Sequence, residues 1–100
     1  MALMKQTPLH HRANPDLLAL MPAAARVVEA GCSSGALAEA YKQRQPGCHY
    51  LGIEIDPAYG VIAKQHCDEV LVADVDGLCQ LPAPRSLQAD LWVFGDCLEH

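Results

Sequence analysis

The sequence predicts an α/β fold in which helices pack against a parallel β-sheet. A short apolar segment ends in a turn that contains two glycines, Gly31 and Gly35, and an apolar helix follows. Further apolar segments alternate with helix patterns, which is the order of βαβ units with right-handed crossovers. Four segments have the composition and length of strands, and they lie at residues 26–30, 49–55, 69–73 and 91–94.

The chain begins with a polar and aperiodic stretch, residues 1–13. His10 and His11 could bind a metal ion there, but a frayed terminus is the preferred interpretation. Asn14 and the proline after it predict the N-cap and first turn of a short helix, which ends at Pro22. This helix covers an edge of the sheet or packs near a ligand pocket.

The first strand, residues 26–30, leads through the glycine turn into a helix that we expect to run from about residue 34 to 44. Leu37, Ala38 and Tyr41 share one face of that helix and are predicted to be buried.

The second strand, residues 49–55, is almost continuously apolar, as expected for a strand buried on both faces. Asp56 and Pro57 are predicted to cap the next helix, residues 58–66.

The third strand, residues 69–73, ends at Asp74. A loop of roughly fourteen residues follows, and loops of this length are commonly functional or mobile. The fourth strand, residues 91–94, is introduced by Asp90 and followed by Gly95 and Asp96.

All parallel strands point the same way, so the residues just past their ends gather at one edge of the sheet. The glycine turn, Glu54, Asp74 and Asp96 therefore converge on the edge where open parallel sheets bind ligands.

Length and composition narrow the function. One hundred residues allow one small domain, and 51% hydrophobic residues suit a packed core. The net charge of −5 disfavours sequence-independent binding to nucleic acid, which requires a basic surface. No segment has the length of a membrane span and the start does not resemble a signal peptide, so we expect a cytoplasmic protein without a membrane partner.

The cysteines number five, an odd count, and no C-x-x-C pair occurs. Reduced thiols are therefore expected. Cys32 lies in the glycine turn, where it either lines a ligand site or, as the preferred interpretation, fills space in the core.

The glycine turn favours a ligand without phosphate. A dinucleotide fingerprint has a glycine between the first and last glycines, whereas Ser33 stands there in this sequence. Glu29 would repel a phosphate, and no Gly-Lys-Ser/Thr follows that would indicate a P-loop. A carboxylate beside such a turn suits a ligand that carries an ammonium group.

With these features, Glu29-x-Gly31-x-x-x-Gly35 resembles motif I of the class I S-adenosylmethionine-dependent methyltransferases, which have a Rossmann-like fold. The resemblance implies that S-adenosylmethionine is the cofactor, with Glu29 near the methionine ammonium. The turn residues Gly31, Cys32, Ser33 and Gly35 would line the same site.

Residues 51–57 resemble the second motif of that family, in which an acid at the strand end binds both ribose hydroxyls. Glu54 takes this role, with Asp56 as the alternative that is better used as a helix cap, and Ile55 would pack on the adenine. By resemblance to the third motif, Asp74 would accept from the adenine amino group, and the Val75 N–H would meet a ring nitrogen.

Residues 89–100 resemble the fourth motif, which lines the methyl-transfer end of the pocket and includes Asp96. His100 could act as general base. Asp96, Glu99 and His100 could instead bind a divalent cation, but a helix start with Asp96 as cap and Glu99 completing a capping box is preferred.

The family fold has seven strands, whereas this sequence has four strand segments. We therefore expect residues 1–24 to form a tail and lead-in helix, and residues 25–100 the cofactor-binding half of a methyltransferase domain. The chain could be a fragment of a longer enzyme, or be completed by self-association or by a partner. The methyl acceptor is not identified. The alternatives are a dinucleotide-dependent Rossmann enzyme and a non-catalytic interaction module that keeps the fold.

Overall fold

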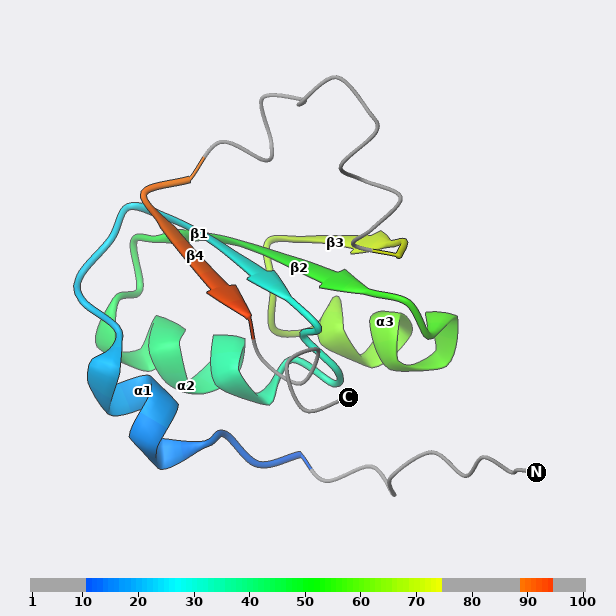
Figure 1. Ribbon diagram of the computed structural model, residues 1–100, viewed down its shortest axis with the longest axis horizontal. Coiled ribbons are helices and arrows are strands. Elements are labelled where there is room, and N and C mark those ends of the chain that lie inside the picture. Colours follow the sequence, from blue (N-terminus) through cyan, green and yellow to red (C-terminus); the bar gives the residue numbers. More distant parts are fainter. Residues whose placement is uncertain (1–10, 75–88, 95–100) are drawn as a thin grey trace.

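The computed structural model describes residues 11–74 and 89–94. In that part of the chain, four parallel strands form one sheet in the order β3-β2-β1-β4 (Figure 1). This confirms the predicted α/β fold class. The elements are α1 (Pro15–Leu20), β1 (Arg26–Ala30), α2 (Ala36–Arg44), β2 (His49–Glu54), α3 (Pro57–Ala63), β3 (Glu69–Val72) and β4 (Leu91–Phe94).

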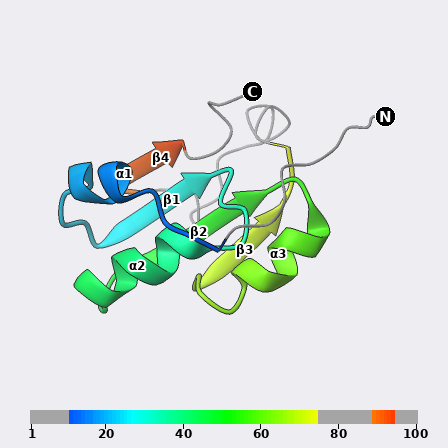
Figure 2. The same ribbon diagram turned by 90° about the horizontal axis from the view of Figure 1, so that it is seen from below.

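The helices α2 and α3 lie on the same face of the sheet (Figures 1 and 2). They make the crossovers from β1 to β2 and from β2 to β3, so the strand order grows in one direction from β1. The strand β4 pairs with the other side of β1, and the strand order reverses there. The turn after β1 therefore lies at the switch point of the sheet, where ligands of such folds bind.

Several elements end a few residues earlier or begin later than the sequence predicts. The helix expected from residue 34 begins at Ala36, because Gly35 has a φ of 87° and cannot be helical. The strand expected to reach residue 55 ends at Glu54, whose carboxylate accepts the N–H of Asp56 and turns the chain.

The other two differences are in α3 and β3. The helix expected over residues 58–66 spans Pro57–Ala63, and the residues after it form hydrogen-bonded turns. The strand expected over residues 69–73 ends at Val72.

The core has two layers, one on each face of the sheet. On the helix side, Val27 and Tyr50 pack with Tyr41 and Ala38 of α2, and the Tyr41 hydroxyl donates to the Pro22 carbonyl at 2.7 Å. On the other side, a second buried cluster contains Val28, Leu51 and Ile53. The strand β2 is thus buried on both faces, as predicted.

The segment before β1 runs along α2 (Figure 2). The Asn14 side chain caps α1, as predicted, by accepting from the N–H groups of Asp16 and Leu17. At the other end, the Arg44 guanidinium donates to the carbonyls of Leu18 and Met21, both at 2.8 Å. Because Arg44 ends α2, these contacts hold α1 near the amino ends of the strands, away from the switch point.

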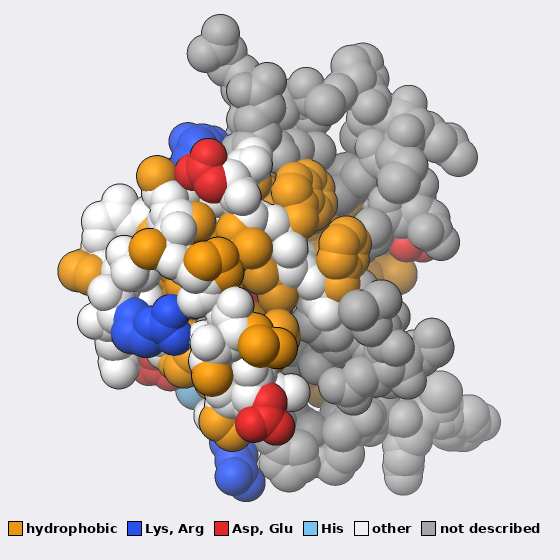
Figure 3. All heavy atoms as spheres, turned by 60° about the vertical axis from the view of Figure 1, so that its left-hand side comes forward, with side chains coloured by type: hydrophobic (Ala, Val, Ile, Leu, Met, Phe, Trp, Pro, Cys, Tyr) orange, Lys and Arg blue, Asp and Glu red, His pale blue; other side chains and the backbone are white. Residues whose placement is uncertain are grey.

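The strand β4 is an edge of the described sheet and presents two aromatic rings to solvent. Val93 faces the helix-side core, so alternation along the strand places Trp92 and Phe94 on the opposite face. Their ring centroids are 6.2 Å apart. Leu20 of α1 is also exposed, and hydrophobic side chains are prominent in the view from the side of α1 (Figure 3).

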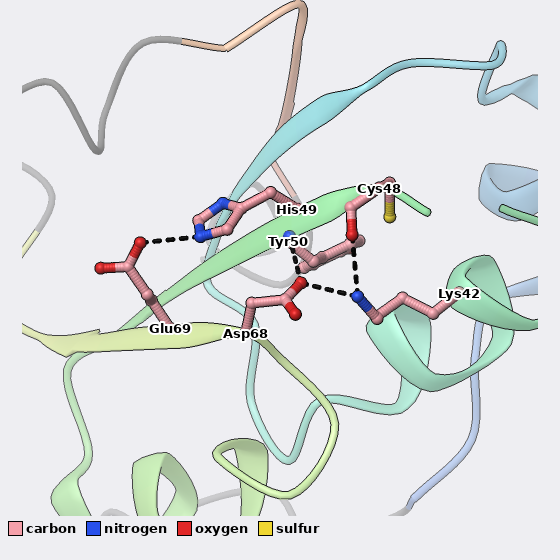
Figure 4. Close-up of polar contacts among 6 residues, drawn as sticks. All are labelled: Lys42, Cys48, His49, Tyr50, Asp68 and Glu69. Carbon is pink, nitrogen blue, oxygen red and sulfur yellow. Dashed lines mark hydrogen bonds and ion pairs between the residues drawn. The ribbon is translucent and has the colours of Figure 1, made fainter. Parts of the chain in front are cut away.

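The amino ends of β2 and β3 are joined by a polar network (Figure 4). The Lys42 ammonium donates to the Cys48 carbonyl at 2.8 Å and to the Asp68 carboxylate at 2.6 Å. The same carboxylate oxygen accepts the Tyr50 N–H at 2.7 Å, and His49 pairs with Glu69 beside it at 2.8 Å.

These contacts change the acidity of Asp68. Burial works to raise the pKa of the Asp68 carboxyl, but the Lys42 ammonium and the Tyr50 N–H outweigh it and hold that pKa below its ordinary value. The Asp68 carboxylate therefore helps to hold β2 and β3 in register, and the Lys42 ammonium balances its charge.

In the described part of the chain, no helix is long and apolar enough to cross a bilayer. The cysteines there, Cys32, Cys48 and Cys67, are free thiols, as expected.

Candidate functional site

The turn after β1 has three residues in the left-handed region of backbone conformation. Gly31 has a φ of 78° and Gly35 one of 87°, which glycine adopts freely. Ser33, between them, has a φ of 53° and is the sole non-glycine residue with positive φ in the described chain. The position that holds glycine in dinucleotide fingerprints thus has a glycine-like conformation here, and a serine occupies it.

Hydrogen bonds fix this turn to the end of β2. The N–H groups of Gly31 and Cys32 both donate to the Ile53 carbonyl, at 2.8 and 3.0 Å. The Ser33 N–H donates to the Glu54 carboxylate at 2.7 Å. The turn is therefore held in one shape by the neighbouring strand, before any ligand binds.

Glu54 stands at the centre of the site. One carboxylate oxygen accepts from Ser33, and the other accepts the Asp56 N–H at 3.0 Å. Glu54 is 8% exposed, and the hydrogen bonds that its carboxylate accepts in the described chain all come from neutral backbone N–H groups. Each oxygen retains acceptor capacity, so the carboxylate can still bind hydroxyl groups.

The two residues after Glu54 have separate environments. Ile55 is 65% exposed at the end of β2 and offers an apolar surface beside the carboxylate. Asp56 accepts the Ala58 N–H at 2.9 Å as the N-cap of α3, which confirms the cap role preferred for it.

Glu29 lies deeper than the sequence suggests. It is 3% exposed, and its carboxylate accepts the Tyr50 hydroxyl proton at 2.7 Å. Burial and then the Glu29 charge raise the pKa of the Tyr50 hydroxyl, so Tyr50 remains a donor at neutral pH. The Glu29 carboxylate thus lies beneath the glycine turn on the helix side of the sheet, where one of its oxygens accepts the Tyr50 hydrogen bond.

Cys32 is buried as well, which agrees with its interpretation as core filler. A Cβ on Gly52 would lie 2.6 Å from the Cys32 sulfur and 3.1 Å from that of Cys67, so glycine at 52 makes room for both. The Cys67 sulfur and burial raise the pKa of the Cys32 thiol. Cys32 is therefore an inert thiol that supports the turn from below.

The neighbouring strands bring further predicted residues to this edge. Glu54 is in register with Val72, and the Ala73 N–H donates to the Glu54 carbonyl at 3.0 Å. Asp74, exposed, is one residue further on. Val75, Asp96, Glu99 and His100 lie outside the described residues.

A polar cluster that no pattern in the sequence predicts lies beside the glycine turn. The Ser34 hydroxyl, in a residue only 1% exposed, is 2.9 Å from the His11 ring, and the other ring nitrogen of His11 pairs with Glu39. His11 is therefore anchored, in contrast to the frayed terminus preferred from the sequence. The only sequence signal was a histidine doublet close to a helix start, and it carries no information about this distant contact.

Comparison with known proteins finds similarity in structure but not in sequence. No family model and no curated protein sequence matches the chain. Among solved structures, it is similar to coclaurine N-methyltransferase bound to N-methylheliamine and SAH, with a TM-score of 0.55 and 17% identity.

The alignment covers 69% of this chain and 21% of that enzyme, so this chain spans about a fifth of its length. At such low identity the similarity shows the fold alone. The four-stranded parallel sheet with its flanking helices matches part of a Rossmann-like methyltransferase fold.

Proposed function

We propose that this chain is the S-adenosylmethionine-binding part of a class I methyltransferase, which transfers a methyl group to an acceptor. The observation that carries the proposal is Glu54, fixed at the end of β2 by a backbone N–H of the glycine turn and by that of Asp56. It joins the two segments that such an enzyme uses to hold the ribose and the methionine. The similarity to a methyltransferase fold supports this assignment.

The residues at this edge fit an adenosyl ligand. A carboxylate with spare acceptor capacity on both oxygens is suited to the two hydroxyls of a ribose, and Glu54 has this property. Ile55 would cover one face of the adenine, and Asp74 would accept from its amino group. Gly31, at positive φ and without a side chain, would let the methionine end approach the backbone of the turn.

Charge favours a ligand without phosphate. Glu54 lies beside the turn, and its described hydrogen bonds come from backbone N–H groups and not from a cation. A pyrophosphate at the turn would be repelled by this carboxylate, whereas a ligand with an ammonium and a sulfonium group would be attracted to it.

The chemistry of this chain would consist mainly of positioning. Bound S-adenosylmethionine supplies an electrophilic methyl group on sulfur. The rigid turn and Glu54 would hold the ligand in one orientation, so that an acceptor nucleophile can attack in line with the carbon–sulfur bond. His100, outside the described residues, remains the proposed proton acceptor.

Calorimetric titration of the chain with S-adenosylhomocysteine (SAH) and with NAD tests the proposal. We expect heat of binding with SAH and none with NAD. Binding of NAD alone would support the dinucleotide alternative. A folded chain that binds neither ligand would support the non-catalytic interaction module.

Two adjacent variants test the role of Glu54. Glu54→Gln removes the charge, and we expect it to weaken SAH binding about tenfold or more, because hydrogen bonds to charged groups contribute about 1.5–3 kcal/mol. Asp56→Asn is the matched control, since asparagine also caps helices and we expect the affinity for SAH to be retained. Circular dichroism must show that both variants are folded. Equal SAH affinity in Glu54→Gln and the unmodified chain would contradict the assignment.

A further inference from the structure

We propose that His11, Glu39 and His66 form a binding site for a divalent transition-metal ion such as Zn²⁺. The three residues come from separate segments: the stretch before α1, the first turns of α2, and the turn after α3. Their donor atoms all lie within 4.8 Å of one another. The site is independent of the cofactor proposed above.

The distances suit a shared ion. His11 Nε2 lies 2.6 Å from one Glu39 oxygen, and His66 Nδ1 lies 3.8 Å from the other. Ligand atoms that bind one zinc ion at about 2 Å lie no more than about 4 Å apart. Small side-chain rotations would therefore bring all three donors to one ion.

The orientation of the His11 ring is already fixed by a second contact. Its Nδ1 is 2.9 Å from the hydroxyl of Ser34, which is buried. Histidines that bind metals typically donate their other N–H to such a partner. A serine hydroxyl can accept as well as donate, so Ser34 can hold the tautomer in which Nδ1 carries the proton and Nε2 is open to the ion.

His66 is held in place by the close approach of α2 and α3. A Cβ on Gly35 would lie 3.3 Å from the Cβ of His66 and 3.1 Å from the Cα of Ala63, so only glycine allows this approach. The rings of His11 and His66 are then 4.6 Å apart between centroids. The fold thus places two imidazoles side by side, with one carboxylate between two of their nitrogens.

A metal ion suits this arrangement because it binds both rings in their neutral form together with the carboxylate. His49 and Glu69 form a comparable surface pair at 2.8 Å, and no third donor joins them among the described residues.

The donor set indicates the class of ion. Two imidazoles and one carboxylate suit Zn²⁺, Co²⁺ or Ni²⁺, whereas Mg²⁺ and Ca²⁺ prefer oxygen donors alone. The side chains of His11, Glu39 and His66 are 35%, 45% and 19% exposed, so an ion has access from solvent. Bound metal would fasten the segment before α1 to both helices and to the glycine turn.

Titration of the chain with Co²⁺, followed by absorption, and with Zn²⁺ in competition with a chromophoric chelator tests the site. We expect one equivalent to bind, with visible d–d bands and without the near-ultraviolet band of thiolate-to-cobalt charge transfer. That ultraviolet band would show that cysteines capture the metal, and it would overturn the proposal.

Variants identify the donors. Changing a residue that orients a metal ligand typically weakens metal binding by roughly tenfold to hundredfold. His66→Gln removes a ligand itself, so we expect a larger loss of Zn²⁺ affinity. Ser34→Ala should weaken binding about tenfold through loss of ring orientation. His49→Gln is the matched control and should bind Zn²⁺ as the unmodified chain does.

A second readout covers variants that fold poorly. In nitrogen-15 spectra of the unmodified chain, Zn²⁺ should shift the ring signals of His11 and His66 and leave those of His49 in place. Unchanged signals for His11 and His66 on saturation with Zn²⁺, or full affinity in folded His66→Gln, would overturn the proposal.

Discussion

Glu54 and Asp68 are carboxylates at opposite ends of the β2–β3 pair, and their environments differ. Asp68, at the amino edge, accepts from the Lys42 ammonium as well as from a backbone N–H. Glu54, at the carboxyl edge, accepts only from backbone N–H groups in the described chain. Asp68 is nevertheless the more exposed of the two, with 37% of its side chain accessible against 8% of the Glu54 residue.

The difference shows that the more buried of two carboxylates is not the one whose charge is balanced by a described cation. At the amino edge, charge is balanced within the protein, and the contacts hold strands and helix together. At the carboxyl edge, backbone donors orient a carboxylate without neutralising it. In the proposed function this charge would attract the ligand, and four changes test the contrast between the edges.

The largest expected effect is on the backbone of the carboxyl edge. Gly35→Ala should lower the free energy of unfolding by about 2–3 kcal/mol, because alanine is strained at positive φ and its Cβ meets the α3 backbone. Denaturant unfolding followed by circular dichroism measures this change.

Gly47, which follows α2 at the amino edge, supplies the control. A Cβ there would meet nothing within 4 Å, so Gly47→Ala should leave stability unchanged or raise it by up to about 1 kcal/mol. Equal losses in the two variants would mean that the turn after β1 is not conformationally special.

The next effect concerns charge at the amino edge. Asp68→Asn should cost about 1 kcal/mol at neutral pH, a value kept small because the pair is partly exposed. Since the pKa of Asp68 is lowered on folding, its contribution is present above the unfolded value near 3.8 and is lost as pH falls through the folded pKa. Urea unfolding of the unmodified chain and of Asp68→Asn should be measured between pH 7 and about pH 2. The two stabilities should converge only below the folded pKa of Asp68. A difference that stays constant across this range would contradict the charged pairing.

A smaller effect is expected at Ser33. Ser33→Gly should raise the unfolding free energy by about 0.5 kcal/mol, since relief of the left-handed strain is partly offset by the greater freedom of glycine in the unfolded chain. Thermal unfolding monitors the change. A loss of stability would show that contacts of the serine side chain outweigh the strain.

The smallest expected effect is on the affinity for SAH when a residue at the amino edge is changed. Asp68→Asn should leave the affinity for SAH within about twofold, a change of less than about 0.5 kcal/mol, because Asp68 lies at the far end of β2. A larger loss would mean that the two edges of the sheet are energetically coupled.

Much of the fold could be predicted from local patterns. The bounds of β1 were predicted residue for residue, because a short apolar segment between an exposed segment and a glycine allows few other strand boundaries. The end of β2 was placed one residue late, since Ile55 continues the apolar pattern and only the contact between Glu54 and Asp56 turns the chain.

The site was less predictable, because its contacts join distant residues. The pairing of Glu29 with Tyr50 depends on the register of two strands, and the contact of His11 with Ser34 crosses 23 positions. Neither leaves a periodic signal. By contrast, Asp56 could be assigned as a cap because capping is local.

Trp92 is the only tryptophan of the chain, and it lies partly exposed on the edge strand β4 with Phe94 beside it. The tryptophan fluorescence of the protein, excited selectively over that of the tyrosines, therefore originates from one strand. Any molecule that docks along that edge would change the emission wavelength or the access of a quencher to a single indole, so an optical titration would report its arrival without a label.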